Sequence, residues 1–416
     1  MRAGRPLSMR VAFVDLLFSW PPHGGADVDL YHVMAGLRSE GIEAQLFFAH
    51  QTASDEAGIA DPESLPFPAT RIDFSPHSFA PDSVTERFRE ALDAWRPDMV
   101  WVMHAFGMKP WLLDGLADFT VVSRYYAHEL MCARDPRRFK HGAPCPNDYL
   151  RTPDVCRDCA LESQRDAIRQ GTYKTWTEEY IAARAYAPEY HALSLGALRK
   201  TRALVVSNTQ LAAELAPLHD DIRVLPGGVD TGAFPHAAHE ANPGRARILM
   251  SGRVDDPLKG LGTLLEAGAA LWQQRQDFEI VLTHHDHDLE NDWVRCTGWL
   301  THEEALAEYA KADVCVVPSV WHEPFGLVAV EAMAAGRAVV ASRTGGLADI
   351  VLDGKTGLLV TPGDAAALAG ALSRLLDDPG ERARMGKAGR ARAESDYDWR
   401  QVVRKRYLPL LEELGG

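Results

Sequence analysis

Residues 313–342 read DVCVVPSVWHEPFGLVAVEAMAAGRAVVAS, and this stretch decides the fold. Two short apolar runs, DVCVVPS and AVVAS, have the length and the β-branched content of buried strands. The apolar segment between them begins near Phe325, is long enough for a helix and ends before Gly336. A strand, a helix and a second strand in this order form a parallel βαβ unit, which predicts an α/β protein.

The same alternation occurs twice more. From Met9, the run VAFVDLLF is followed by the turn PPHGG, a helical pattern over about 27–38 and the run QLFFAH. From Arg245, the run ARILMSG is followed by LGTLLEAGAALWQQ and then by FEIVLTH. Strands that alternate with helices predict parallel sheets covered on both faces. We therefore expect two facing, Rossmann-like, doubly wound domains that bind ligands at the carboxyl ends of their strands.

The composition suggests where these domains begin and end. Residues 231–245 have no apolar period and are rich in Ala, His, Pro and Gly, which is typical of a linker. We expect an N-terminal domain over 1–235, with a cysteine-rich insertion at 132–159, and a C-terminal domain over 236–396. Residues 397–416 are predicted to form a helix that packs back on the N-terminal domain.

The charge balance excludes several partners. The 416 residues carry a formal net charge of −14, which opposes nonspecific binding to nucleic acid or anionic lipid. No apolar run approaches the length of a transmembrane helix. The basic start MRAGRPLSMR leads into an apolar run that contains Asp15 and ends in Pro-Pro, unlike a signal peptide. We expect a cytoplasmic protein, and peripheral contact with a membrane stays open.

A lone carboxylate, Glu331, interrupts the apolar helix of the opening stretch. A buried carboxylate needs hydrogen-bond donors because its desolvation is otherwise costly. A pair of ribose hydroxyls would serve, and Glu323, just before the helix, would face another part of the same ligand. The amides of Phe325, Gly326 and Leu327 would point at that ligand from the helix N-terminus. The alternatives are a structural Arg or Lys partner for Glu331 and a favourable N-terminal charge in Glu323.

Two loops are candidates for binding phosphate. His23, Gly24 and Gly25 lie between a strand and a helix, where glycines allow a close approach to helix amides. The spacing is not GxGxxG, so a plain turn is the competing interpretation. Arg253 and Lys259 follow the first strand of the second domain and would stabilise a diphosphate as it leaves. A solvated loop paired with the neighbouring aspartates is the alternative.

The cysteines fall into two groups. Cys296 and Cys315 are isolated in apolar surroundings and are predicted core residues. A disulfide framework is not expected in a chain of this size. Four clustered thiolates with one CxxC suit a structural zinc ion, whereas an iron–sulfur cluster, a redox pair or free thiols are the alternatives. The clustered residues are Cys132, Cys145, Cys156 and Cys159.

Two polar segments have less specific interpretations. A basic run after the first of these cysteines would bind an anionic acceptor or form a solvated face. Its members are Arg134, Arg137, Arg138 and Lys140. The segment THHDHD at 283–288 offers carboxylates and imidazoles to a metal ion, with a polar loop as the favoured alternative. Its candidate ligands are His284, His285, Asp286, His287 and Asp288.

Taken together, these segments resemble the retaining glycosyltransferases of family 4, which have the GT-B fold. The resemblance runs nearly end to end. PSVWHEPFGLVAVEAMAAGRAVVASRTGG resembles that family's E-x7-E signature, with Glu323 and Glu331 as its two glutamates. SGRVDDPLKGLGTLLEA, LADIVLDGKTGLLVTPGD and the HGG loop also match. VLPGGVDTGAF differs from the family pattern in having Gly227 where Asn is usual.

The resemblance implies a role for each of these residues. Arg253 and Lys259 would hold the donor's diphosphate, and Glu331 would bind the ribose. Glu323, with the amides from Phe325 to Leu327, would contact the transferred sugar. The residues given a part in catalysis are Glu323, His128, Arg253 and Lys259.

The first domain would supply the remaining contacts. Gly25, beside Gly24, would approach the diphosphate. His128 in RYYAHEL would lie near the transferred sugar, as a histidine does in the family. His104 in WVMHAF is a weaker candidate, because a histidine at a strand end is more often structural.

The implied reaction moves a sugar from a nucleoside-diphosphate sugar to an acceptor hydroxyl, with retention and without a catalytic metal. The leaving phosphate would accept the acceptor's proton on the same face, so the enzyme would act by positioning and charge stabilisation. The acceptor would be a small molecule, a glycan or a lipid-linked glycan. The alternatives are an epimerase or a phosphorylase of the same architecture, or a noncatalytic nucleotide-sugar binder.

Overall fold

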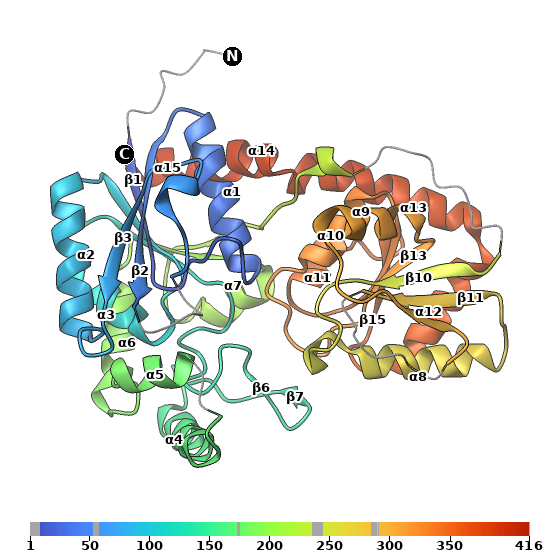
Figure 1. Ribbon diagram of the computed structural model, residues 1–416, viewed down its shortest axis with the longest axis horizontal. Helices are drawn as coiled ribbons and strands as arrows, with labels where there is room; N and C mark the ends of the chain where they lie inside the picture. The colour runs from blue at the N-terminus through green and yellow to red at the C-terminus, as the bar shows by residue number, and fades with distance from the viewer. Residues whose placement is uncertain are drawn as a thin grey trace. The chain divides into compact units, whose positions relative to one another are not determined.

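The computed structural model describes two compact units, which are drawn in Figure 1. Unit 1 comprises Met1–Leu225 and Val403–Gly416, and unit 2 comprises Pro226–Val402. The chain thus passes from unit 1 to unit 2 at 225–226 and returns to unit 1 at 402–403. The sequence analysis placed these two boundaries at 235 and 396. The described residues are 9–52, 58–172, 175–234, 244–283, 289 and 291–415.

Unit 1 contains a seven-stranded sheet in the order β3-β2-β1-β4-β5-β8-β9, and every neighbouring pair is parallel. The strands are β1 (Arg10–Asp15), β2 (Glu43–Gln51), β3 (Ala69–Phe74), β4 (Met99–Val102), β5 (Val121–Arg124), β8 (Ala203–Val206) and β9 (Ile222–Val224). The helices around it are α1 (Gly25–Ser39), α2 (Pro81–Trp95), α3 (Lys109–Gly115), α6 (Glu189–Lys200), α7 (Thr209–Leu215) and α15 (Leu408–Gly415).

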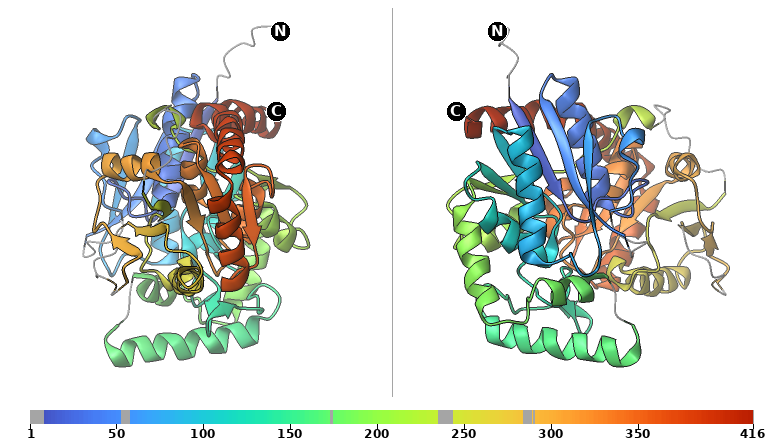
Figure 2. Two further views of the ribbon diagram at one scale, coloured as in Figure 1. Left: turned by 90° about the vertical axis from the view of Figure 1, so that its right-hand side faces the viewer. Right: turned by 60° about the vertical axis from the view of Figure 1, so that its left-hand side comes forward.

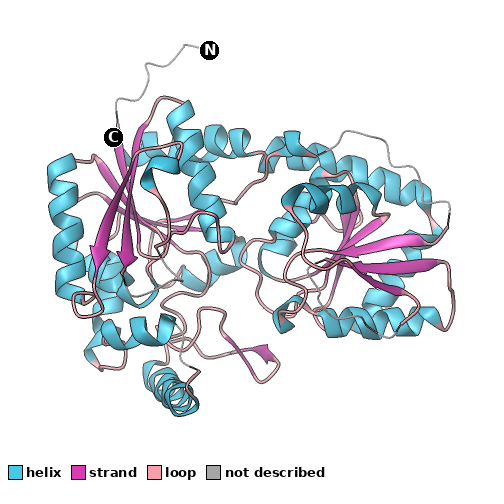
Figure 3. Ribbon diagram, viewed as in Figure 1, coloured by secondary structure: helices cyan, strands magenta, loops and turns pink. Residues whose placement is uncertain are grey.

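Side chains of β1 alternate between the two faces of this sheet, as the period of a strand requires. Val14 belongs to a core cluster with Phe88 of α2. Phe13 instead packs on Trp101 at 5.9 Å between ring centroids, and Trp101 packs on Tyr407 of the C-terminal segment at 5.6 Å. Figure 3 shows helices on both faces of this sheet. The residues after 402 therefore complete the core of unit 1.

An insertion between β5 and α6 leaves the layers of this sheet. It contains the two-residue strands β6 (Phe139–Lys140) and β7 (Ala143–Pro144), which pair antiparallel. The helices α4 (Pro153–Gln170) and α5 (Thr175–Ala182) follow. The views in Figures 1 and 2 agree that α4 lies apart from the seven-stranded sheet.

Unit 2 contains a six-stranded sheet in the order β12-β11-β10-β13-β14-β15, which is also parallel throughout. The strands are β10 (Ala246–Met250), β11 (Phe278–Leu282), β12 (Val294–Cys296), β13 (Val314–Val317), β14 (Ala338–Ser342) and β15 (Gly357–Val360). The helices are α8 (Leu261–Trp272), α9 (His302–Lys311), α10 (Leu327–Ala334), α11 (Gly345–Ile350), α12 (Ala365–Asp377), α13 (Pro379–Arg392) and α14 (Trp399–Val402).

The opening stretch folds as predicted. Strands β13 and β14 are parallel neighbours, with Val314 opposite Ala338, and α10 connects them. The helix begins at Leu327, two residues later than expected, because Gly326 has φ +111°, which is outside the helical region. The expectation of two doubly wound parallel sheets is confirmed. Among the described residues, no helix combines the length and the apolar character that crossing a bilayer requires.

Candidate functional site

The candidate donor residues of unit 2 cluster at one edge of its sheet. Strands β10 and β13 are parallel neighbours, so the loops that follow them emerge at the same edge. The loop after β10 carries Arg253 and Lys259, and the loop after β13 carries Glu323. A Cβ placed on Gly252 would lie 3.3 Å from Cγ2 of Val328, so the β10 loop also lies against the first turn of α10.

Glu323 is a buried carboxylate with three side-chain donors. The Lys259 ammonium lies 3.0 Å from both of its oxygens. Ser319 Oγ donates to Oε2 at 2.9 Å, and Trp321 Nε1 donates to the same oxygen at 3.0 Å. Burial by itself would raise the pKa of Glu323, but Lys259 and the two neutral donors together hold the pKa below its usual value. Glu323 is therefore ionised at neutral pH.

Two glycines from the start of α11 hold the backbone of this loop. The Gly346 amide donates to the Glu323 carbonyl at 2.8 Å. A Cβ on Gly346 would lie 2.2 Å from the Phe325 carbonyl oxygen, closer than two such atoms approach. Gly345 has φ +47°, and a Cβ there would lie 2.1 Å from the Glu323 carbonyl oxygen. Only glycine therefore fits at these positions without moving the Glu323 loop.

We expect the substitution Gly346→Ala to displace the Glu323 loop, because the added methyl overlaps a backbone oxygen. Overpacking of this kind lowers the free energy of unfolding by about 1–3 kcal/mol. The matched control is Gly370→Ala on α12, where a Cβ meets nothing within 4 Å. That control should raise stability by about 0.5–1 kcal/mol through helix propensity. Urea unfolding of both variants checks this, and equal effects would contradict the assigned contact.

Glu331 lies in α10 and is half-buried. Tyr309 OH of α9 donates to its Oε2 at 2.7 Å, and Tyr309 also shares a hydrogen bond with Ser251 at the end of β10. Burial raises the pKa of Glu331 in spite of the Tyr309 hydrogen bond. The described contact is thus with a tyrosine, rather than the Arg or Lys that the sequence left as an alternative. Through Tyr309, Glu331 is linked to the end of β10, which precedes Arg253.

Arg253 is the remaining candidate donor-binding side chain at this edge of the unit 2 sheet. Its side chain is exposed, six residues before Lys259 in the same loop. Gly326, the N-cap of α10, and the amides beside it lie in the loop that carries Glu323. The structure thus brings Lys259 and Glu323 into contact, whereas the sequence analysis gave them different parts of a ligand.

In unit 1, the Gly24–Gly25 turn precedes α1. Asp27 accepts hydrogen bonds from the amides of Ser19, His23 and Gly24 at 3.0–3.1 Å. The Gly24 amide is therefore already bonded, which leaves Gly25 as the better candidate for phosphate contact. A Cβ on either glycine would meet nothing within 4 Å among the described residues. Packing within unit 1 does not explain these glycines, so the close approach of a ligand stays a prediction.

The two candidate histidines of unit 1 occupy different environments. His128 is buried in the loop after β5, and its amide donates to the Pro136 carbonyl at 3.0 Å. His104 lies after β4 between the rings of Phe106, at 4.2 Å, and Tyr126, at 5.7 Å. Burial lowers the pKa of His104 to about 3, with a smaller contribution from Lys109. A neutral, aromatic-packed imidazole agrees with a structural role for His104.

A buried ion pair near these histidines was missed by the sequence analysis. Lys109 and Glu129 are in direct contact, and both side chains are fully buried. The Lys109 ammonium also donates to the Arg124 carbonyl at 2.5 Å. Burial lowers the pKa of Lys109 and raises the pKa of Glu129, and the charge of each partner opposes this shift. In the sequence, this buried pair could have been suspected from a lysine within the apolar run GMKPWLL.

A small cavity of about 50 Å³ opens beside this pair in unit 1. Its lining includes Glu129, Glu179 and Tyr180. Glu179 Oε2 and Tyr180 OH are buried without a hydrogen-bond partner among the described residues. Burial raises the pKa of Glu179 to about 8, against amide hydrogen bonds from Met108 and Gly107. At neutral pH Glu179 is therefore protonated and can donate as well as accept.

The raised pKa of Glu179 predicts a pH dependence of stability. Between the ordinary value of 4.5 and about 8, the folded protein keeps a proton that the unfolded chain has released. The free energy of unfolding therefore falls as the pH rises through this window. Glu179→Gln cannot ionise, so its melting temperature should fall less than that of the wild type between pH 5 and pH 8. Parallel curves for the two proteins would contradict the assignment.

The basic run of the insertion has partners within unit 1. Arg137 pairs with Asp135 at 2.7 Å, and Lys140 donates to Cys159 Sγ at 3.2 Å. Arg138 pairs with Glu214, and Arg134 donates to the Phe139 carbonyl. These contacts make the run part of the local structure rather than an open patch for an anion. The candidate metal ligands of residues 284–288 lie outside the described residues.

Comparison with known proteins places this geometry in a family. Residues 245–378 match the model of the family described as glycosyl transferases group 1. Phosphatidyl-myo-inositol mannosyltransferase of Mycobacterium leprae is 33% identical over 306 residues, covering 71% of this chain and 74% of that protein. Glycogen synthase of Mycobacterium tuberculosis is 33% identical over 264 residues, or 59% of this chain. The chain spans 61% of the length of that glycogen synthase.

Solved structures share the architecture. Sucrose-phosphate synthase from Thermosynechococcus elongatus has a TM-score of 0.66 and 21% identity, covering 98% of this chain and 99% of that one. Anabaena HepE in complex with UDP has a TM-score of 0.65 and 17% identity, covering 97% and 100%. At these identities the likeness shows the fold alone. With a relative that is 33% identical and covered to 74%, the chain belongs to the group 1 glycosyl transferases, and its two parallel-sheet units have the GT-B fold.

Proposed function

We propose that this protein transfers a sugar from a nucleoside-diphosphate donor to an acceptor hydroxyl, with retention of anomeric configuration. The observation that carries the proposal is the polar cluster at the β10–β13 edge of unit 2. There an exposed arginine and a lysine–glutamate pair come from loops that emerge together, and a tyrosine-bound glutamate comes from helix α10. A cation next to a carboxylate suits a ligand that is anionic at one end and rich in hydroxyls at the other.

Each member of the cluster would hold a different part of the donor. Lys259 has three N–H donors, of which two are directed at the oxygens of Glu323. The third would bind a phosphate oxygen, together with the Arg253 guanidinium. Glu331 would accept hydrogen bonds from the ribose hydroxyls, oriented by Tyr309. Glu323, ionised and fixed by its donors, would accept hydrogen bonds from hydroxyls of the transferred sugar.

The reaction would need no nucleophile from the protein. The bond between the sugar's anomeric carbon and the phosphate oxygen breaks, and the nucleoside diphosphate leaves with the electron pair. The acceptor oxygen attacks from the same face and gives its proton to the leaving phosphate. Arg253 and Lys259 would stabilise the charge that develops on that phosphate. His128 would position the transferred sugar from unit 1.

The acceptor would bind at the cavity of unit 1 that Glu129, Glu179 and Tyr180 line. The protonated Glu179 and the Tyr180 hydroxyl offer it donors and acceptors, because both have buried atoms without described partners. The nearby basic side chains already have partners. These observations favour a neutral, polyhydroxylated acceptor over an anionic one. Transfer to a lipid-linked glycan at a membrane surface, by a protein that is otherwise cytoplasmic, stays a prediction.

The test is acceptor-dependent release of nucleoside diphosphate. A panel of nucleotide sugars is first screened by thermal shift, and the donor that binds is then incubated with neutral and phosphorylated acceptors. We expect nucleotide release with neutral polyols, and NMR should show the anomeric configuration of the donor preserved in the product. An isomerised donor without acceptor would indicate an epimerase, and donor binding without turnover would indicate a noncatalytic binder. An inverted product would contradict the retaining mechanism.

A further inference from the structure

The four clustered cysteines of the insertion line one pocket in unit 1. Cys132 belongs to the loop after β5, and Cys145 directly follows the β6–β7 hairpin. Cys156 and Cys159 lie one turn apart near the start of α4, so their side chains share a face of that helix. Three separate segments thus bring thiols to a single pocket. Neither of the other two cysteines, on β12 and β13, belongs to unit 1.

The surroundings of the pocket suit an anionic thiolate centre. A divalent ion bound by four thiolates carries two net negative charges, which need nearby cations when partly buried. Lys140 Nζ lies 3.2 Å from Cys159 Sγ, and Arg134 also lines the pocket. Both cations come from the segment that connects Cys132 to Cys145. These two members of the basic run therefore lie beside the thiols.

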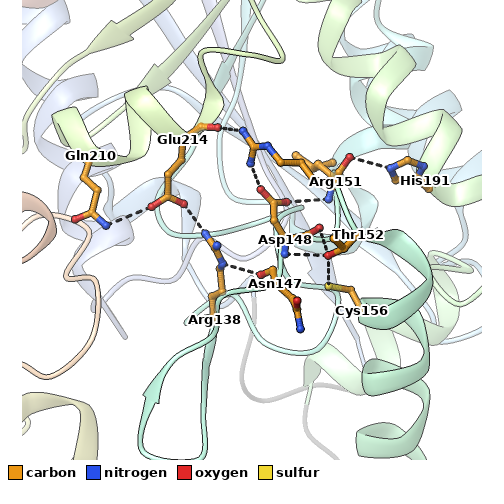
Figure 4. Close-up of polar contacts among 10 residues, drawn as sticks. Arg138, Asn147, Asp148, Arg151, Thr152, Cys156, His191, Gln210 and Glu214 are labelled. Atoms are coloured by element: carbon orange, nitrogen blue, oxygen red, sulfur yellow. Dashed lines mark hydrogen bonds and ion pairs between the residues drawn. The ribbon is translucent and has the colours of Figure 1, made fainter.

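The segment that carries these cysteines has little core of its own. Between Cys132 and α4 its regular structure is two strands of two residues each, and its buried apolar side chains include Tyr149 and Leu150. Polar contacts hold much of the remainder, as Figure 4 shows. Arg138 Nε donates to the Asn147 carbonyl at 3.0 Å. Core-poor segments of this kind are commonly held together by a metal ion or by disulfides.

The local contacts also fix the start of α4, where two of the thiols lie. Thr152, the N-cap residue of α4, donates from Oγ1 to the Asp148 carbonyl at 2.9 Å. The same hydroxyl lies 3.7 Å from Cys156 Sγ. Arg151 pairs with the Asp148 carboxylate, so the turn before the helix is bonded at both ends. The CxxC pair is therefore presented from a fixed element, while the other two thiols come from loops.

We propose that this pocket binds one zinc ion through the thiolates of Cys132, Cys145, Cys156 and Cys159. Four sulfur ligands without an open position make a closed, structural site. Zn–S bonds are about 2.3 Å long. Among the described residues, no three of these sulfurs lie within 4.8 Å of one another, so binding draws the thiols inward by rotation about their Cα–Cβ bonds. The four thiol protons pass to solvent as the ion binds.

The site has a consequence that rests on the proposed function. Cys132 and Arg134 line the zinc pocket and also the cavity that we assign to the acceptor. The loop at 132–136 is thus a shared wall. Zinc would fix one side of that wall and thereby position the acceptor. Loss of zinc should raise the KM for the acceptor by about tenfold and leave the KM for the donor unchanged. An effect of this size is typical when the groups that orient a site's binding residues are removed.

The primary test is the metal content of the purified full-length protein, measured by mass spectrometry after desalting in metal-free buffer. We expect one equivalent of zinc in the wild type and in the control Cys296→Ser, whose thiol lies in unit 2. We expect less than a tenth of an equivalent in Cys156→Ser and Cys159→Ser. Metal content does not depend on turnover, so a zinc-loaded protein without transferase activity would refute the proposed function and not the site.

A second measurement covers the case in which the serine variants do not fold. The wild type is stripped with a chelator and titrated with Co²⁺, and the absorption bands of tetrahedral cobalt–thiolate should appear at one equivalent. Iron with a visible charge-transfer band would instead identify an iron–sulfur cluster and overturn the proposal. A metal-free wild type would also overturn it, whether thiol titration finds all six cysteines free or finds a disulfide.

Discussion

Replacing Lys259 by alanine should reduce turnover by about 10²–10³-fold, the loss typical of removing one charged group from a transition state. Lys259 lies at the β10–β13 edge of unit 2 with its ammonium 3.0 Å from Glu323. In the proposed reaction it stabilises the charge that develops on the departing phosphate. The loss should appear in kcat as well as in kcat/KM, because the leaving group is more negative in the transition state than in the bound donor.

The same substitution has a structural effect that must be separated from the catalytic one. Without Lys259, Glu323 is a buried carboxylate that has lost its cation, which costs about 3 kcal/mol of stability. The double variant Lys259→Ala, Glu323→Gln removes that uncompensated charge and should recover stability but not turnover. Lys311→Ala on α9, whose side chain pairs with Glu308, is the control for loss of a lysine. Recovery of turnover in the double variant would contradict the catalytic role.

Replacing Glu331 by glutamine should weaken donor binding by about 10- to 100-fold. Hydrogen bonds to a charged group contribute about 1.5–3 kcal/mol, which converts to a loss of this size. Glutamine keeps the shape of the side chain and its contact with Tyr309, so the fold should be unchanged. The effect should be as large for the nucleoside diphosphate as for the whole donor, because Glu331 is assigned to the ribose. Calorimetric titration with both ligands measures it.

Two further variants test whether Glu331 acts in this way. Tyr309→Phe removes the hydrogen bond to Oε2 and should weaken binding less than Glu331→Gln, because the carboxylate stays in place. Glu266→Gln changes an exposed glutamate of α8 and should leave affinity unchanged. If Glu331→Gln weakens binding of the sugar donor but not of the free nucleoside diphosphate, then Glu331 contacts the sugar and its assignment to the ribose is wrong.

The fold of unit 2 could be predicted because its signals are local. The runs around α10 have strand length, and the apolar segment between them ends at Gly336. The start of the helix was misplaced by two residues, because a glycine with positive φ looks the same in sequence as one inside a helix. In the second sheet, β10 and β13 are separated by two helices and two strands, so their pairing follows from the parallel topology rather than from local signals.

The contacts within the candidate site were less predictable. Lys259 and Glu323 are 64 residues apart, and they meet because their strands are neighbours in the sheet. The cavity of unit 1 was missed altogether. Glu129 lies in the loop after β5 and Glu179 on the short helix α5, and only packing shows that they are buried. Charged residues normally indicate solvent exposure, which is why sequence reasoning did not assign them.

A crystal structure of the protein with a bound nucleoside diphosphate would test the donor site directly. We predict phosphate oxygens within hydrogen-bond distance of Lys259 Nζ and the Arg253 guanidinium, and ribose hydroxyls bonded to the Glu331 carboxylate. We also predict that the Lys259–Glu323 contact persists in the complex. A nucleotide bound with its phosphates away from the β10 loop, or with its ribose away from α10, would contradict the proposed donor site.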